Sequence, residues 1–425
     1  MSASAFSDLT TKRKGLPLAK GEDRTGARPD GMELRQGARR SVLVVQRRLP
    51  HYRVPYFEVL RVELSRRGWD LRLAHGVGTA AEQIKNDSGS IAWAESLETR
   101  YLLGGRICWQ PFSHLIRDAA MVVVTPENKL VNNIPLQFFR SDDVRVGLWG
   151  HGANLQGTTD SWRERFKRIS AKRADWWFGY TDMSVPLILR TGFPADRITT
   201  LNNSVDTVEL QTLKARTSRE SLDSLRARIG LKGDAVGIYV GSLYEEKRIE
   251  FMLATAQQIH DKVPGFEFLV VGDGPQRSIV ESFCAAHPWV IHLGIRKGQE
   301  KVDLISLAKV MINPGLVGLS ILDAFVLGTP MITTDCGLHS PEIAYLQDGV
   351  NGVMTANSAE AYASTVASIL TDTAALDRLR AGCERSAAQY TIQNMAVNFA
   401  NGVEACASQP IFRRHQANVV IGKDQ

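Results

Sequence analysis

The sequence of 425 residues is poor in cysteine and has no long apolar run. Its five cysteines are scattered and form no C-x-x-C pair, which argues against a disulfide framework and against a zinc site. No stretch of about 20 apolar residues is free of charge, so we expect no membrane-spanning helix. The first 40 residues contain no apolar core segment, so we expect no secretory signal. These absences together predict a cytoplasmic protein.

Composition and charge narrow the class further. Hydrophobic residues make up 44% and charged residues 23%, which is ordinary for a globular protein and excludes a mainly disordered or collagen-like chain. At roughly 150 residues per domain, the length predicts two to three domains. Residues 1–40 hold four of the six net positive charges, because nine lysines and arginines stand there against five acids. We therefore interpret 1–40 as a disordered basic tail and expect no nucleic-acid partner.

Apolar runs alternate with helical spacing along the rest of the chain. Short runs that are wholly or mainly apolar are typical of strands buried on both faces of a parallel sheet, and we expect strands at 42–45, 71–74, 121–124, 146–149, 176–180, 237–240, 266–271, 310–312 and 331–334. Helical spacing lies between them, as at 55–66, 249–259 and 319–327. The alternation predicts an α/β fold with two Rossmann-like domains that face each other across a cleft.

The same pattern sets the expected domain boundaries. We place an N-terminal domain at 41–205 and a C-terminal domain at 206–388. A helix at 389–407 is expected to pack back on the N-terminal domain, and 408–425 is expected to be a flexible tail. Ligands of open α/β sheets bind beyond the carboxyl ends of the strands, so the loops at those ends are the candidate sites.

One such loop runs from Gly241 and Ser242 to Lys247 and Arg248. It follows a strand and opens a helix, so a tight turn, free helix N–H groups and a positive charge stand together. This combination suits a phosphate. A capped helix start with solvated charges is an equally good interpretation of this stretch alone.

A second glycine-containing loop precedes the helix at 319–327. Gly315 and Gly318 would let a diphosphate approach the main chain closely, and Asp323 could accept hydrogen bonds from a ribose diol. The alternative is a pair of packing glycines with an acid that favours the helix N-terminus. In the first half, His151 stands between two glycines at the carboxyl end of a strand and could touch a ligand, although a lone histidine is more often structural.

In this order, the motifs resemble those of retaining, family 4 type glycosyltransferases of the two-Rossmann GT-B fold. The resemblance covers roughly 41–400 and is densest over 237–355. The strings that carry it are Arg53-Val-Pro-Tyr-Phe, Asn203-Ser-Val-Asp206-Thr, Tyr239-Val-Gly-Ser-Leu with Glu246-Lys247, Val270-Val-Gly-Asp-Gly-Pro, His292-Leu-Gly294, Pro314 through Pro330 and Asp348-Gly-Val-Asn-Gly352.

The resemblance implies transfer of a sugar from a nucleotide-diphosphate-sugar to a hydroxyl of a polysaccharide or lipid-linked glycan, with retained configuration. Lys247 and the helix N-terminus after Gly318 would stabilise the leaving diphosphate without a metal or another cofactor, and His151 would orient the donor sugar. The donor-binding positions would be Gly241, Ser242, Arg248, Gly272, Gly294, Gly315, Val317, Gly318, Leu319 and Asp323, and the acceptor-side positions would be Arg53 and Tyr56.

Two positions depart from the pattern of the family. Ser242 stands where an arginine is usual. Gly315 stands where the family has the first of two glutamates separated by seven residues, and Asp323 replaces the second. A charge-assisted hydrogen bond contributes roughly 1.5–3 kcal/mol, so each loss is expected to weaken donor binding about tenfold to a hundredfold. The groups that could compensate are Arg248 or Arg296 for the charge, and the main-chain N–H groups of 317–319 for the sugar hydroxyls.

Residues 162–173 carry six basic residues, with Trp162, Phe166 and Ile169 on one helical face. Such a helix could rest on anionic lipid at the inner face of the cell membrane, beside a lipid-linked acceptor, and a solvated surface helix is an equally good interpretation. Two other functions stay open: a sugar-nucleotide epimerase or hydrolase of the same fold, and a degenerate, non-catalytic nucleotide-sugar-binding partner in a glycan-assembly complex.

Overall fold

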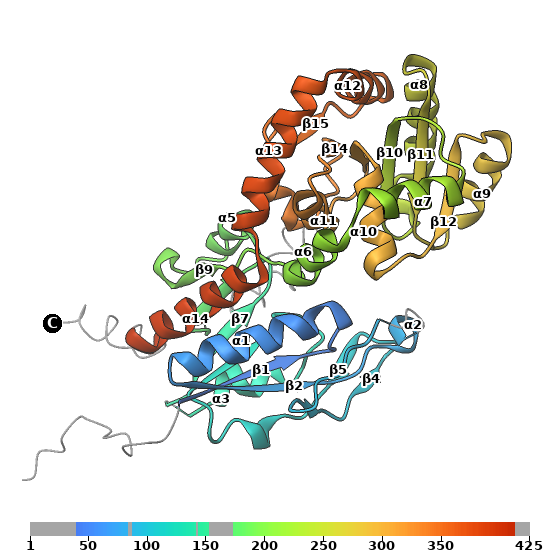
Figure 1. Ribbon diagram of the computed structural model, residues 1–425. Helices are drawn as coiled ribbons and strands as arrows, with labels where there is room; N and C mark the ends of the chain where they lie inside the picture. The colour runs from blue at the N-terminus through green and yellow to red at the C-terminus, as the bar shows by residue number, and fades with distance from the viewer. Residues whose placement is uncertain (1–39, 84–86, 142, 153–172, 413–425) are drawn as a thin grey trace, which may run out of the picture. The chain divides into compact units, whose positions relative to one another are not determined.

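The structure is a computed structural model that describes residues 40–83, 87–141, 143–152 and 173–412. Within these residues the chain forms two large parallel sheets, each with helices packed on it (Figure 1). Most of the basic helix expected at 162–173 and most of the two expected tails lie outside the described residues. Among the described residues, no helix combines the length and the apolar character needed to cross a bilayer.

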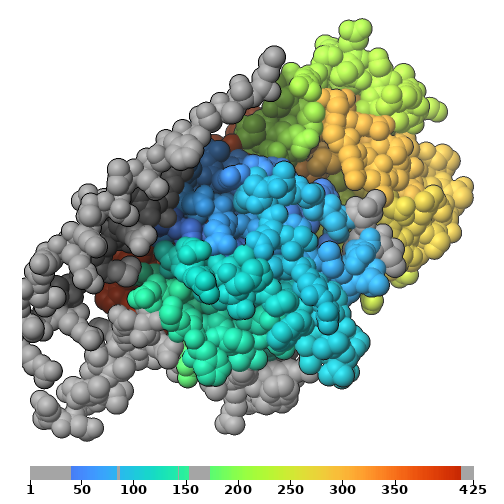
Figure 2. Space-filling view, turned by 90° about the horizontal axis from the view of Figure 1, so that it is seen from below, coloured from blue at the N-terminus to red at the C-terminus, as the bar shows by residue number. Residues whose placement is uncertain are grey.

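The first sheet has seven strands in the order β3-β2-β1-β6-β7-β8-β9, and all neighbouring pairs are parallel. Its strands are β1 (Arg40–Gln46), β2 (Trp69–His75), β3 (Glu95–Ser96), β6 (Met121–Val124), β7 (Arg145–Trp149), β8 (Trp176–Gly179) and β9 (Ile198–Thr200). Its helices are α1 (Val54–Arg66), α2 (Ala80–Gln83), α3 (Asn133–Phe139) and α5 (Ser184–Leu189). A separate antiparallel hairpin consists of β4 (Arg100–Leu102) and β5 (Ile107–Trp109). The blue-to-teal surface of this half is continuous in the space-filling view (Figure 2).

The second sheet has six parallel strands in the order β12-β11-β10-β13-β14-β15. They are β10 (Ala235–Val240), β11 (Phe266–Val271), β12 (Val290–Gly294), β13 (Val310–Ile312), β14 (Met331–Thr334) and β15 (Gly352–Thr355). The helices of this half are α6 (Thr207–Arg216), α7 (Arg219–Ile229), α8 (Ile249–Lys262), α9 (Arg277–Ala286), α10 (Gly298–Leu307), α11 (Ser320–Leu327), α12 (Ala359–Thr371) and α13 (Thr373–Gln389). β10 and, apart from Glu267, β11 have no charged residue, because helices cover both faces of the sheet. The predicted α/β fold with two parallel sheets is confirmed.

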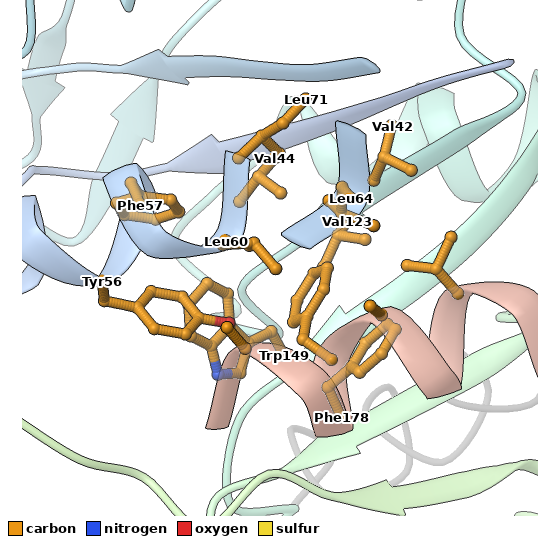
Figure 3. Close-up of a cluster of buried hydrophobic side chains, with 14 of the residues drawn as sticks. Val42, Val44, Tyr56, Phe57, Leu60, Leu64, Leu71, Val123, Trp149 and Phe178 are labelled. Carbon is orange, nitrogen blue, oxygen red and sulfur yellow. The ribbon is translucent and has the colours of Figure 1, made fainter. Parts of the chain in front are cut away.

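The last helix, α14 (Ile392–Ser408), packs on the first sheet. It contacts α1, β8 and β9 and lies alongside α1 (Figure 1). Its Phe399 ring stacks on the Phe178 ring of β8, with the centroids 4.4 Å apart. Trp149, the last residue of β7, is buried against Tyr56, Phe57 and Phe399 in the same core (Figure 3). The loop that follows β7 therefore starts from a rigidly packed residue.

Candidate active site

The two loops expected to hold a phosphate meet at the carboxyl edge of the second sheet. Lys247 ends the short 3₁₀ helix η4 (Glu245–Lys247) after β10, and its Nζ donates to the carbonyl oxygen of Leu316 at 2.6 Å. In return, the N–H of Leu316 donates to the carbonyl oxygen of Glu246 at 2.8 Å. Because Leu316 lies between β13 and α11, the ammonium is held beside the entrance to α11.

Burial governs the charge of Lys247. The residue is 7% exposed, and among the described residues its ammonium lies within 4.0 Å of no carboxylate. Burial lowers the pKa of Lys247 to about 8, because taking the ammonium out of water disfavours the charged form. A buried cation whose hydrogen bond goes to a neutral carbonyl is electrostatically suited to a bound anion.

The glycine at 315 is required by the approach of these two loops. A Cβ atom at Gly315 would lie 2.4 Å from the carbonyl oxygen of Lys247 and 2.6 Å from that of Glu246. Any side chain there would push the two backbones apart. A glutamate of the kind that the resemblance led us to expect at this position would therefore not fit this arrangement of the two loops.

A histidine that the sequence analysis did not single out fixes the other side of the loop. The N–H of Val317 donates to Nδ1 of His339 at 3.2 Å, and Nε2 of His339 lies 2.8 Å from the carbonyl oxygen of Thr334. Nδ1 must then be the acceptor and Nε2 the protonated donor, so the ring is neutral. The N–H of Ser340 donates to the carbonyl oxygen of Val317 at 3.0 Å and completes the attachment.

The electrostatic surroundings favour this neutral form. Burial lowers the pKa of His339, and the positive charges of Lys247 and Arg248 lower it further. The engagement of Val317 also corrects one expectation, because its N–H is already donated and is not available to a sugar hydroxyl. Among the described residues, the N–H groups of Gly318 and Leu319 donate to no acceptor.

Buried polar atoms without partners flank the same loop. Oδ1 of Asn313, which precedes the loop, and Oγ of Ser320, which follows it, are buried and make no hydrogen bond within the described residues. Buried polar groups in proteins are nearly always paired, so a cluster of unpaired ones calls for an explanation. A polar ligand at the entrance to α11 would provide one.

The two arginines considered as replacements for the charge missing at Ser242 are already engaged. Arg248 has a left-handed backbone (φ 57°) and donates to Pro314, Thr334 and Asn357 at 2.7–3.2 Å. Its bond to the Pro314 carbonyl holds the loop after β13 in place. Arg296 lies 3.3 Å from Glu300 and donates to the carbonyl of its neighbour at 3.0 Å. Ser242 itself is exposed.

The other expected glycines lie in stacked loops at the same sheet edge. Gly272 has φ 148°, and a Cβ there would lie 1.8 Å from the carbonyl oxygen of Gly241, so the loops after β10 and β11 touch backbone to backbone. The N–H of Gly272 donates to the carbonyl of Gly294 at 2.9 Å, which joins the loop after β12. The structure therefore brings Gly241, Gly272 and Gly294 together.

Asp323 is buried, and both its oxygens accept from Lys301 Nζ, at 3.0 and 3.1 Å. A ribose diol would have to share the carboxylate with that lysine.

The expected residues of the first half have different surroundings. His151 is exposed, and its ring centroid lies 5.4 Å from that of Tyr180. Arg53 is buried beside Trp149 and Tyr180. Tyr56 is 1% exposed in the core beside Trp149 (Figure 3), so its burial does not favour the acceptor-side role expected for it, which stays a prediction. Its spacing with Leu60 and Leu64 on one helical face already indicated a core position.

Comparison with solved structures defines the class of fold. The Anabaena protein HepE in complex with UDP superposes with a TM-score of 0.65 at 14% identity, over 86% of this chain and 100% of that chain. The chain has the mixed α/β, two-sheet GT-B fold of glycosyltransferases. The resemblance seen in the sequence is confirmed at this level.

The sequence comparisons are consistent with the GT-B fold. Residues 234–372, which form most of the second half, match the family model described as "Glycosyl transferases group 1". Alpha-D-kanosaminyltransferase of Streptomyces kanamyceticus is 26% identical over 31% of this chain and 34% of its own length. The 2-deoxystreptamine glucosyltransferase of the same organism is 26% identical over 43% and 49%. The chain thus spans about a third to a half of the length of these relatives.

Proposed function

We propose that the protein transfers a sugar from a nucleotide-diphosphate-sugar to a hydroxyl of a glycan or lipid-linked glycan acceptor, with retention of configuration. The observation that carries the proposal is the pairing of the buried Lys247 ammonium with the unengaged N–H groups of Gly318 and Leu319 around one loop. The names of the two Streptomyces relatives support sugar transfer, and the structures of HepE with UDP and with UDP-glucose support a nucleotide-sugar donor.

The chemistry requires stabilisation of a leaving diphosphate. As the bond between the sugar and the phosphate breaks, negative charge develops on the diphosphate. The Lys247 ammonium and the positive N-terminal end of α11 oppose that charge directly, so no metal ion is needed. The acceptor hydroxyl attacks from the face that the diphosphate leaves and gives its proton to the departing diphosphate, which retains the configuration without a side-chain nucleophile. His151 orients the donor sugar from the first half.

The proposal is tested by thermal shift with UDP-, GDP-, dTDP- and ADP-sugars, followed by nucleotide release with glycan acceptors. We expect one donor class to raise the melting temperature and to be turned over. Lys247→Ala should lose both effects, whereas Lys262→Ala, at an exposed position on α8, should keep them. Near-normal turnover by Lys247→Ala would refute the assignment. A nucleotide-sugar that binds without being turned over would instead favour the non-catalytic partner.

A further inference from the structure

A buried arginine that has no acidic partner among the described residues lies at the carboxyl edge of the first sheet. Arg53 follows β1, ends the 3₁₀ helix η1 (His51–Arg53) and precedes α1. The residue is 7% exposed. Its guanidinium carbon lies 4.7 Å from the ring centroid of Trp149 and 5.6 Å from those of Tyr52 and Tyr180. These three aromatic rings form what we call the ring cage.

The polar partners of Arg53 are the neutral hydroxyls of Tyr180 and Tyr52. One guanidinium nitrogen is 3.5 Å from the hydroxyl of Tyr180, and no carboxylate of the described residues lies within 4.0 Å. Two arginines that are buried to a similar degree have closer polar partners than Arg53. Arg140 is 2.7 Å from the carboxylate of Asp175, and Arg197 donates to two backbone carbonyls, at 2.9 and 3.3 Å.

A buried guanidinium needs compensation for its lost hydration. The ring cage offsets part of this cost through cation–π contacts, but rings do not accept the in-plane hydrogen bonds of the guanidinium. An anion with two oxygens matches those donors, because the planar fork of arginine binds carboxylate and phosphate groups in pairs. The arrangement therefore favours an oxyanion in contact with Arg53.

The position of the ring cage indicates which molecule carries that anion. Trp149 is the last residue of β7 and Tyr180 follows β8, so the cage lies at the edge where these parallel strands and β1 end. The ring of His151 is 5.4 Å from that of Tyr180. The cage therefore adjoins the histidine proposed to face the donor sugar, which stands two positions after Trp149. The diphosphate, in contrast, is assigned to Lys247 on the other sheet.

We propose that Arg53 and its ring cage bind an anionic group of the acceptor, a phosphate or a carboxylate. This inference rests on the proposed function, because it takes the edge of the first sheet as the acceptor side. It adds a chemical class to the acceptor, namely a hydroxyl compound that carries an oxyanion close to the hydroxyl that receives the sugar.

The first experiment tests for the anion site itself in the full chain. The Lys247→Ala variant, which lacks the ammonium of the donor loop, is titrated with inorganic phosphate and with acetate at constant ionic strength, and the melting temperature is recorded. We expect phosphate or acetate to raise it. Adding Arg53→Met should abolish the shift, and Arg53→Lys should keep part of it. Arg61→Met serves as the matched control, since Arg61 also stacks on a tryptophan, Trp93, at 4.5 Å. Equal shifts with and without Arg53 would overturn the inference.

The second experiment uses the donor identified by the nucleotide-sugar screen and three matched acceptors: glucose, glucose 6-phosphate and glucuronate. We expect kcat/KM to be at least tenfold higher for one of the anionic acceptors, and Arg53→Met to remove that preference. Which anionic acceptor is preferred distinguishes phosphate from carboxylate. An equal preference in wild type and Arg53→Met would sink the inference but leave the transferase intact, whereas absence of donor binding in the wild type would refute the proposed function itself.

Discussion

Replacing Lys247 by methionine should separate stability from ligand binding. Burial lowers the pKa of this lysine from 10.5 to about 8. At about 1.36 kcal/mol per pKa unit, burial disfavours the charged form by about 3.4 kcal/mol. Methionine keeps much of the volume and removes this cost, but it loses the hydrogen bond to Leu316, a charged-donor bond worth about 1.5–3 kcal/mol. We expect Lys247→Met to unfold with a free energy equal to that of the wild type at pH 7, or up to about 2 kcal/mol higher.

The pH dependence of stability gives the sign of the effect. Between about pH 8 and 10.5 the unfolded chain holds the Lys247 proton and the folded chain does not, so this group makes stability rise with pH across that window. Lys247→Met should lack this rise. Urea unfolding at pH 7 and at pH 10, with Lys262→Met as the exposed control, measures both quantities. A variant that is several kcal/mol less stable than wild type at pH 7 would contradict the account of the buried charge.

Ligand binding should respond in the opposite direction. The affinity for a nucleoside diphosphate should fall about tenfold per pH unit above about pH 8, because the free protein loses the ammonium that attracts the anion. Lys247→Arg, which stays charged, should show no such fall up to pH 10, and Lys247→Met should bind weakly at every pH. Calorimetric titration across the range checks this. A wild-type affinity that is independent of pH from 7 to 10 would refute the assigned role of the lysine.

Three further outcomes test the loop and its supports. Gly315→Ala should weaken nucleotide binding at least tenfold, because its Cβ would lie 2.4 Å from the Lys247 carbonyl. Gly318→Ala, whose Cβ would meet nothing closer than 3.8 Å, should weaken it less in the same titration. Wild-type nucleotide affinity should fall as the pH is lowered into the acid range, since protonation of His339 at Nδ1 removes the acceptor of the Val317 N–H. The affinity of His339→Asn should not change with pH in the same acid range. The rate of sugar transfer should be unchanged by EDTA, because Lys247 and the N-terminus of α11 supply the positive charge. A loss of activity with EDTA that a divalent cation restores would contradict this role.

The sequence predicted the strands of both sheets best where they are continuously apolar. The run at 42–45 appears as β1 and the mainly apolar run at 266–271 as β11, because strands buried on both faces are mainly apolar. β9 and β15 were missed, since they are short and only partly buried. A strand whose polar faces reach solvent does not differ from a loop in composition alone.

The candidate site could be predicted in part for a related reason. β10 and β13 are parallel neighbours, so the loops that follow them had to meet at one edge, and Lys247 accordingly contacts Leu316. His339 could not be found this way, because its role depends on how the loop after β14 folds back onto Val317. The acceptor-side role of Tyr56 came from the resemblance of its loop and stays a prediction, whereas its helical spacing and its burial both indicate a core position.

The contacts that hold the loop between β13 and α11 lead to a last prediction about sugar selectivity. Lys247 and the N–H groups after Gly318 are placed for the diphosphate, whereas no carboxylate can stand at position 315 to bind sugar hydroxyls, and the Val317 N–H is donated to His339. A charge-assisted hydrogen bond to a sugar hydroxyl would favour the full donor by roughly 1.5–3 kcal/mol, or about tenfold to a hundredfold. Without it, we expect the free nucleoside diphosphate to bind within about tenfold of its sugar conjugate. Paired calorimetric titrations measure the ratio, and a conjugate that binds more than a hundredfold tighter would mean that this half reads the sugar through groups other than those of the loop.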